Sequence, residues 1–116
     1  MTQVTETQEL LVTYFTGLAD YIGLGTATGT PGNTPTPSNE ATGGSPAYAR
    51  IATTWDVTGP SALGESVTMN VAPGTYAYML LCSASSGNNM VDWCPVTSQV
   101  CPSQTTITIV PLATAS

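Results

Sequence analysis

Side chains that carry out most catalysis are scarce in this chain. It has no histidine and no lysine, a single arginine (Arg50), and seven acidic residues among 116. Nucleophilic catalysis needs a base beside the nucleophile, and glycoside hydrolysis needs two facing carboxylates. The acidic residues are scattered, and Asp56 and Asp92, each next to a tryptophan, are better explained as solvated acids at strand ends. The sequence therefore predicts that the protein is not an enzyme.

Metal and cofactor sites are not predicted either. The cysteines are Cys82, Cys94 and Cys101; no histidine is present to complete a zinc site with them, and burial as small apolar side chains explains them more simply. Because three is an odd number, at most one intrachain disulfide forms, and a Cys94–Cys101 bridge remains open at this point. Gly23 and Gly25 lead into no helix and are followed by no lysine, so they do not form a phosphate-binding loop.

The low charge of the chain limits its partners. Charged residues make up 7% of the sequence, against about 25% in an ordinary soluble domain. The formal net charge is −6, and one arginine does not neutralise a row of phosphates, so neither nucleic acid nor an anionic membrane is an expected partner. No apolar run approaches the ~20 residues of a membrane helix, and the opening residues, MTQVTE, do not resemble a signal peptide. We therefore expect synthesis in a cytoplasm.

Three side chains are candidates for recognition. Arg50 is expected to form an intrachain ion pair with Glu40 or Asp56, or to contact an acidic group across a subunit interface, and a guanidinium suits either task. Trp55 and Trp93 are large enough to stack on a sugar, although packing in the core explains them more simply. These alternatives differ in whether the three side chains are buried or exposed.

The elements that position these residues follow from hydrophobic periodicity. Residues 5–17 are predicted to form a helix, since Leu11, Tyr14 and Phe15 lie on one helical stripe, and Gly17 is its expected end. Residues 26–46 are rich in proline and threonine and are predicted to form a long surface loop that adds nothing to the core. Neither the apolar stripe of the helix nor the long loop is easily packed within a small domain, so both are candidate contact surfaces.

The rest of the chain is predicted to be strands, at residues 19–25, 48–57, 65–71, 75–83, 90–97 and 104–110. Residues 65–71 alternate, and the turn at 72–74 favours a hairpin with residues 75–83. Residues 75–83 are more continuously apolar, which favours a central position in a sheet. The predicted fold is one mostly-β domain over residues 1–116, an antiparallel β-sandwich or partly open barrel of five to six strands with one N-terminal α-helix.

One segment is similar to a known family. Residues 39–50, NEATGGSPAYAR, followed by Thr54 and Trp55, resemble a motif of small structural proteins of tailed bacteriophages, notably phages of actinobacteria. In that family a helix and a strand precede a loop of the NEVTGGSPAYAR type, and β-strands follow it. The turn from Val71 to Thr75 is also similar, and the resemblance covers about residues 9–83. The last third departs from the family pattern, which carries a glycine-rich stretch where this chain has residues 82–87.

The resemblance implies a non-enzymatic component of a virion. The first hypothesis is a capsid decoration (cement) protein, with the major capsid protein as partner and a homo-oligomer, a trimer, as its bound form. The second is a minor tail or fibre protein that binds the host surface, through a carbohydrate on one of the tryptophans. A bacterial binding module is the third. The candidate interface residues are Leu11, Tyr14, Phe15, Pro35, Pro37, Tyr48 and Arg50.

Overall fold

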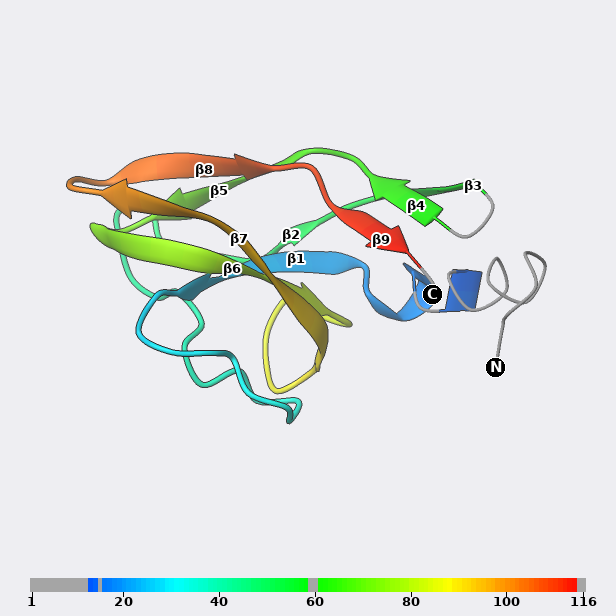
Figure 1. Cartoon of the computed structure of the whole chain (residues 1–116). Helices are drawn as coiled ribbons and strands as arrows, with labels where there is room; N and C mark the ends of the chain where they lie inside the picture. Colours follow the sequence, from blue (N-terminus) through cyan, green and yellow to red (C-terminus); the bar gives the residue numbers. More distant parts are fainter. Residues whose placement is uncertain (1–12, 15, 59–60, 115–116) are drawn as a thin grey trace.

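The described part of the protein is mostly β-strand, as predicted (Figure 1). The structure is a computed structural model and describes residues 13–14, 16–58 and 61–114. Every strand pair in these residues is antiparallel. The strands are β1 (Tyr21–Thr26), β2 (Ile51–Ala52), β3 (Trp55–Thr58), β4 (Ser61–Gly64), β5 (Val67–Val71), β6 (Gly74–Cys82), β7 (Met90–Cys101), β8 (Thr105–Ile109) and β9 (Leu112–Thr114).

Strand β6 is the centre of the largest sheet. The strands form three sheets, in the orders β2-β1-β6-β7, β3-β4-β9 and β5-β8. The predicted central position of residues 75–83 is confirmed, since β6 lies between β1 and β7. Its apolar side chains face both ways: Met79 and Leu81 belong to the main core, while Leu80 and Cys82 belong to a second cluster on the opposite face. Such a strand needs cover on both faces of its sheet.

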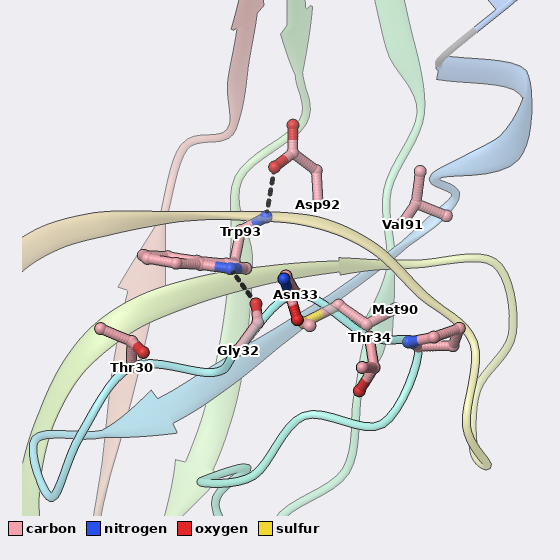
Figure 2. Close-up of a pocket in the computed structure, with 9 residues that line it drawn as sticks. Thr30, Gly32, Asn33, Thr34, Met90, Val91, Asp92 and Trp93 are labelled. Carbon is pink, nitrogen blue, oxygen red and sulfur yellow. Dashed lines mark hydrogen bonds between the residues drawn. The ribbon is translucent and has the colours of Figure 1, made fainter.

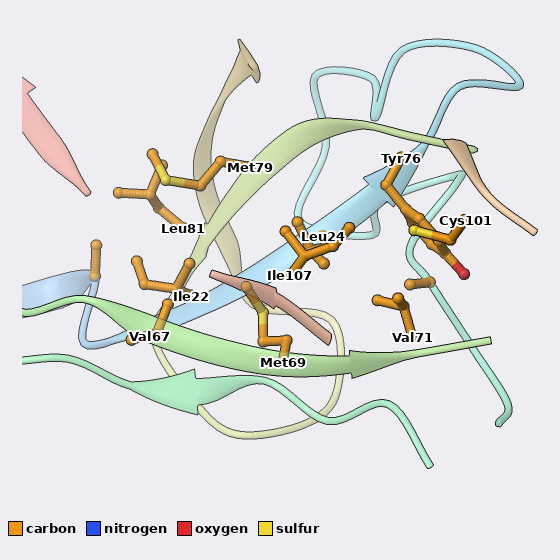
Figure 3. Packing of buried hydrophobic residues seen from close by; sticks show 12 residues of the cluster. Ile22, Leu24, Val67, Met69, Val71, Tyr76, Met79, Leu81, Cys101 and Ile107 are labelled. Carbon is orange, nitrogen blue, oxygen red and sulfur yellow. The ribbon is translucent and has the colours of Figure 1, made fainter. Parts of the chain in front are cut away.

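The main core lies between the β5-β8 sheet and the four-stranded sheet (Figure 3). The alternation predicted for residues 65–71 is confirmed, because Val67, Met69 and Val71 are buried while Thr68 is exposed. Ile107 of β8 adds to the same side of the core. The side chains that meet them from the four-stranded sheet are Ile22, Leu24, Tyr76, Met79, Leu81 and Cys101.

The predicted hairpin of residues 65–71 with 75–83 is wrong. β5 pairs with β8 along its whole length, and β6 pairs with β1 and β7. The physical reason is that β5 is apolar on one face only, so it covers the core from the opposite layer, whereas β6 is apolar on both faces. The turn at Ala72–Pro73 is therefore a corner between layers, and the Tyr76 hydroxyl holds it by donating to Ala72 O at 2.6 Å.

The predicted strand at residues 48–57 is divided into two. β2 pairs with β1, β3 pairs with β4, and residues 48–50 lie in no strand. The short strands β4 and β9 were not predicted, because segments of four and three residues are too short to show an alternation. The described residues therefore contain nine strands rather than five or six.

Only the end of the predicted helix 5–17 falls within the described residues. Thr13, Tyr14 and residues 16–18 are helical, so the helix continues one residue past Gly17. Leu11 and Phe15 lie outside the described residues. The side chain of Tyr14 is 72% exposed and is open to a neighbouring molecule. Within the described part of the chain, no helix has the length and apolar character needed to cross a membrane.

The stretch 26–46 is mostly exposed, as predicted for a surface loop, but it also contributes buried residues, contrary to the prediction that it adds nothing to the core. Residues 30–35 lie on the side of the four-stranded sheet away from β5 and β8 (Figure 1), whereas Glu40 and Ala41 lie beside β1. Pro31 and Ala41 are buried, and Met90 N donates to Pro35 O at 3.0 Å, which ties the stretch to the start of β7. Residues 30–35 thus lie beside Met90 and Trp93 of the second apolar cluster, whereas Ala41 packs in the main core.

All three cysteines are free. Cys94 and Cys101 both lie on β7, where seven residue steps at about 3.3 Å place their Cα atoms roughly 23 Å apart. A disulfide needs Cα atoms within about 7 Å of each other. The Cys94–Cys101 bridge that the sequence left open is therefore excluded within one chain.

Alkylation of the folded protein will distinguish these thiols. Cys82 will react slowly, because burial raises its pKa to about 11 and leaves little thiolate at neutral pH. Cys94 will react before it, since Cys94 is only half-buried, although burial also raises its pKa. Timed iodoacetamide labelling with peptide mass spectrometry measures the order, and the unfolded protein, as control, will label at all three positions. Labelling of Cys82 ahead of Cys94 would contradict the structure.

Candidate functional site

Arg50, the single cation of the chain, is buried in a hydrogen-bond network. Its side chain is 3% exposed. Nε and Nη2 donate to the two carboxylate oxygens of Glu40 at 2.7 and 2.8 Å, a two-pronged ion pair. The other three N–H groups donate to Ala84 O, Asn89 Oδ1 and Gly87 O at 3.2, 2.7 and 2.9 Å. Every donor of the guanidinium therefore has an acceptor, and the predicted pair with Glu40 is confirmed.

Tyr48 completes this network. Its hydroxyl donates to Glu40 Oε2 at 2.7 Å and accepts from Leu24 N at 3.1 Å. A Cβ atom on Gly23 would lie 2.6 Å from that hydroxyl, so glycine in β1 makes room for the phenol. Burial, together with the bond to Glu40, raises the pKa of Tyr48 well above its ordinary value of 10. The phenol therefore stays protonated and keeps its role as donor.

The network fastens three distant segments to one another. Glu40 belongs to the stretch 26–46, Arg50 directly precedes β2, and its other acceptors lie in the loop between β6 and β7. The far end of the stretch is held separately, since Gln104 accepts from Ser45 N and donates to Pro46 O, both at 3.1 Å. Residues 39–50 thus supply Glu40, Tyr48 and Arg50 to the network, and both backbone groups that Gln104 binds.

A groove of about 630 Å³ opens between the stretch 26–46 and β7 (Figure 2). The stretch lines it from Thr30 to Pro35, and β7 lines it from Met90 to Trp93. The Trp93 indole N–H donates to Gly32 O at 2.7 Å. Tyr78 packs against the indole at 85°, with the ring centroids 5.5 Å apart. These two contacts fix the plane of the indole in the wall of the groove.

The two tryptophans have different surroundings. Trp55 packs against the main core, and its indole N–H donates to Ala19 O at 2.8 Å. Trp93 packs against the second cluster and also faces the groove. Of the two indoles that were candidates for sugar stacking, Trp93 therefore lines a groove formed by residues that the structure describes.

Two exposed leucines lie side by side on the β3-β4-β9 sheet. Asp56, Leu63 and Leu112 lie opposite one another on the three strands, so they share one face of the sheet. Leu63 is 53% exposed and Leu112 is 60% exposed. The neighbouring residue Ala62 is buried, which shows that the opposite face is turned toward the protein. We call the surface formed by Leu63 and Leu112 the leucine face.

The other predicted interface residues fall in two places. Pro35 is exposed and lines the groove, and Pro37, half-buried, follows it in the chain. Tyr48 and Arg50 lie in the buried network, where their polar groups hold parts of the same chain together. The structure therefore brings the prolines to a surface and uses Tyr48 and Arg50 inside the fold.

Comparisons add no functional assignment to this geometry. Among the described residues, no group of three or more acidic, cysteine or histidine side chains is placed to hold a metal ion. The chain matches no protein-family model, no curated protein and no solved structure. Its function is therefore inferred from two exposed features of the described residues, the groove and the leucine face.

Replacing Arg50 with methionine will lower the free energy of unfolding by about 3 kcal/mol, because it leaves the Glu40 carboxylate without its partner in a mostly buried site. Urea denaturation followed by tryptophan fluorescence measures the change. Glu65→Gln, at an exposed acid, is the matched control and will change stability by less than about 0.5 kcal/mol. Equal, small effects of both substitutions would show that the network does not support the fold.

Stability will fall as the pH rises above about 10. The phenol of Tyr48 titrates near 10 in the unfolded chain and well above 10 in the folded one, so the folded state keeps a proton that the unfolded state loses. The contribution is complete below pH 10 and declines above it by about 1.4 kcal/mol per pH unit. Tyr48→Phe will reduce this slope in urea melts at high pH, while Tyr76 and Cys82, whose pKa values burial also raises, retain part of it. Tyr14→Phe controls for loss of an exposed phenol, and a slope unchanged in Tyr48→Phe would refute the assignment.

Proposed function

We propose that the protein is a non-enzymatic structural component of a virion, a capsid decoration protein that binds the major capsid protein and stabilises the shell. The observation that carries this proposal is the leucine face. Burial of apolar surface contributes about 25 cal/mol per Å², so a neighbouring subunit that covers this face gains binding energy from it. Repeated over many copies on a shell, a modest contact area becomes a substantial stabilisation.

The edges of the same sheet support an assembly role. Among the described strands, β3 and β9 each pair only with β4, so each leaves one edge without a neighbouring strand. Such edges present unpaired N–H and C=O groups that a strand of another subunit can satisfy. A partner that docks here would cover Leu63 and Leu112 and extend the sheet at the same time.

The composition of the surface fits close subunit packing. With 7% charged residues, the chain brings few charges that would have to be desolvated in an interface. The network around Arg50 holds segments of the domain together through a buried ion pair, so it does not require charged residues on the surface. The resemblance of residues 39–50 to small phage structural proteins points to the same class, and a cyclic homo-oligomer such as a trimer is the arrangement we propose.

A second candidate is a minor tail or fibre protein that binds the host surface. The groove beside Trp93 favours it, because an aromatic side chain in an open groove is suited to ligand binding rather than to a shell contact. Copy number separates the two roles. Mass spectrometry of purified particles will find the protein in numbers comparable with the major shell subunit if it decorates the shell, and in a few copies if it belongs to the tail. Its absence from particles would refute both.

A charge on the leucine face will block incorporation. Leu63→Lys leaves the fold intact, because the residue is exposed and Asp56 lies opposite it to accept the new charge. The variant will be at least about tenfold depleted from particles, since burying an ammonium in an apolar contact removes well over 1.4 kcal/mol of binding energy. The control is Val100→Lys, at a valine of β7 that is 75% exposed, and it will assemble as the wild type does. Equal incorporation of both variants would rule out the leucine face as the contact.

A further inference from the structure

We propose that the groove between the stretch 26–46 and β7 binds a neutral saccharide, with the indole of Trp93 as the stacking surface. The proposal goes beyond assembly and does not depend on it, because the groove and the leucine face share no residue. Figure 2 shows the indole above Gly32 and Thr30, with Asn33 beside it. This arrangement places one aromatic ring and several uncharged polar groups around one open space.

The indole is preorganised for stacking in the absence of a ligand. Its N–H is occupied by Gly32 O, and Tyr78 packs against it at 85°, so the ring does not have to be ordered on binding. A pyranose ring has a face of C–H groups that fits the electron-rich face of an aromatic ring. Because the indole N–H is already used, the ring offers its face rather than a hydrogen bond.

The polar groups beside the indole match hydroxyl groups. The Asn33 amide both donates and accepts, and so does the Thr30 hydroxyl. Neither side chain makes a hydrogen bond to any residue that the structure describes, and both are exposed in the groove. A sugar hydroxyl, which also donates and accepts, can therefore pair with either of them without breaking a contact of the fold.

The charge of the groove selects against anionic ligands. Asp92 is the only charged residue among those that line it. The single arginine of the chain is 3% exposed and has an acceptor for each of its donors, so it is not available to a ligand. A phosphate or a uronate would find no cation here and would meet a carboxylate instead. The saccharide is therefore expected to be neutral.

Two other ligand classes fit the groove less well. Quaternary ammonium groups are bound by cages of several aromatic rings, and proline-rich peptides by grooves with several aromatic side chains. This groove has one aromatic residue, and its other apolar residues are Pro35, Met90 and Val91. Both classes are included in the test as alternatives.

The two indole N–H groups provide a direct test on the full chain. In ¹⁵N-labelled protein, each tryptophan gives one indole signal, and Trp55→Phe identifies which belongs to Trp93. The probes are neutral trisaccharides of glucose, galactose, mannose and N-acetylglucosamine. We expect at least one of them to move the Trp93 signal to saturation while the Trp55 signal stays in place.

Asn33→Ala tests the polar side of the groove. It will weaken binding of that trisaccharide about fivefold, the loss expected for one hydrogen bond. Asn88→Ala is the matched control, at an exposed asparagine outside the groove, and it will bind as the wild type does. Since both asparagines are exposed, both variants are expected to fold, and the unchanged Trp55 signal verifies this.

Four results would overturn the proposal. No neutral trisaccharide moves the Trp93 signal; a trigalacturonate moves it as strongly as the neutral sugars do; tetramethylammonium or a proline-rich peptide moves it while the sugars do not; or Asn33→Ala and Asn88→Ala bind equally well. None of these results bears on incorporation into particles, so failure here is distinguishable from failure of the proposed assembly role.

Discussion

The buried ion pair of Glu40 and Arg50 determines the course of the longest segment without strands. A buried guanidinium has to satisfy five donors, and here they are satisfied by a carboxylate and by three acceptors of the loop between β6 and β7. Because a misplaced segment would leave a charge buried and unpaired, alternative paths are disfavoured by several kcal/mol. We infer that the pair acts mainly by making one path of the chain more favourable than others. Its net contribution to the free energy of unfolding is reduced by the cost of removing both charges from water.

The remaining architecture follows from this constraint. With Glu40 fixed, residues 26–46 lie against the four-stranded sheet, and residues 30–35 lie beside Met90 and Trp93 on its second apolar face. The same placement brings Gly32 within hydrogen-bond distance of Trp93 and so forms one wall of the groove. A domain of 116 residues thus covers a sheet on both faces with one thin layer of strands and one of irregular chain.

Local sequence patterns predicted where the strands lie better than they predicted which strands pair. The alternation of Val67, Met69 and Val71 fixed the face that β5 buries, and the continuous apolar run of β6 correctly indicated a central strand. The choice of β8 over β6 as partner of β5 depends on how the layers stack, which no short segment encodes. The order at 26–46 depends on contacts with residues 84–104, and the leucine face depends on strands of four and three residues. The Arg50–Glu40 pair was predictable, because a chain with one cation has few ways to bury it.

The groove wall is attached to the body of the protein through main-chain atoms. Gly32 and Pro35 contribute carbonyl oxygens, which every amino acid carries. The Asn33 side chain between them is exposed in the groove, and the Thr34 hydroxyl donates only to Thr36 O of the same stretch, at 3.3 Å. Substitutions at these two positions therefore leave the attachment intact. Substitutions at Asn33 and Thr34 can alter which ligand the groove binds without destabilising the fold. Closely related chains are expected to differ first at these positions.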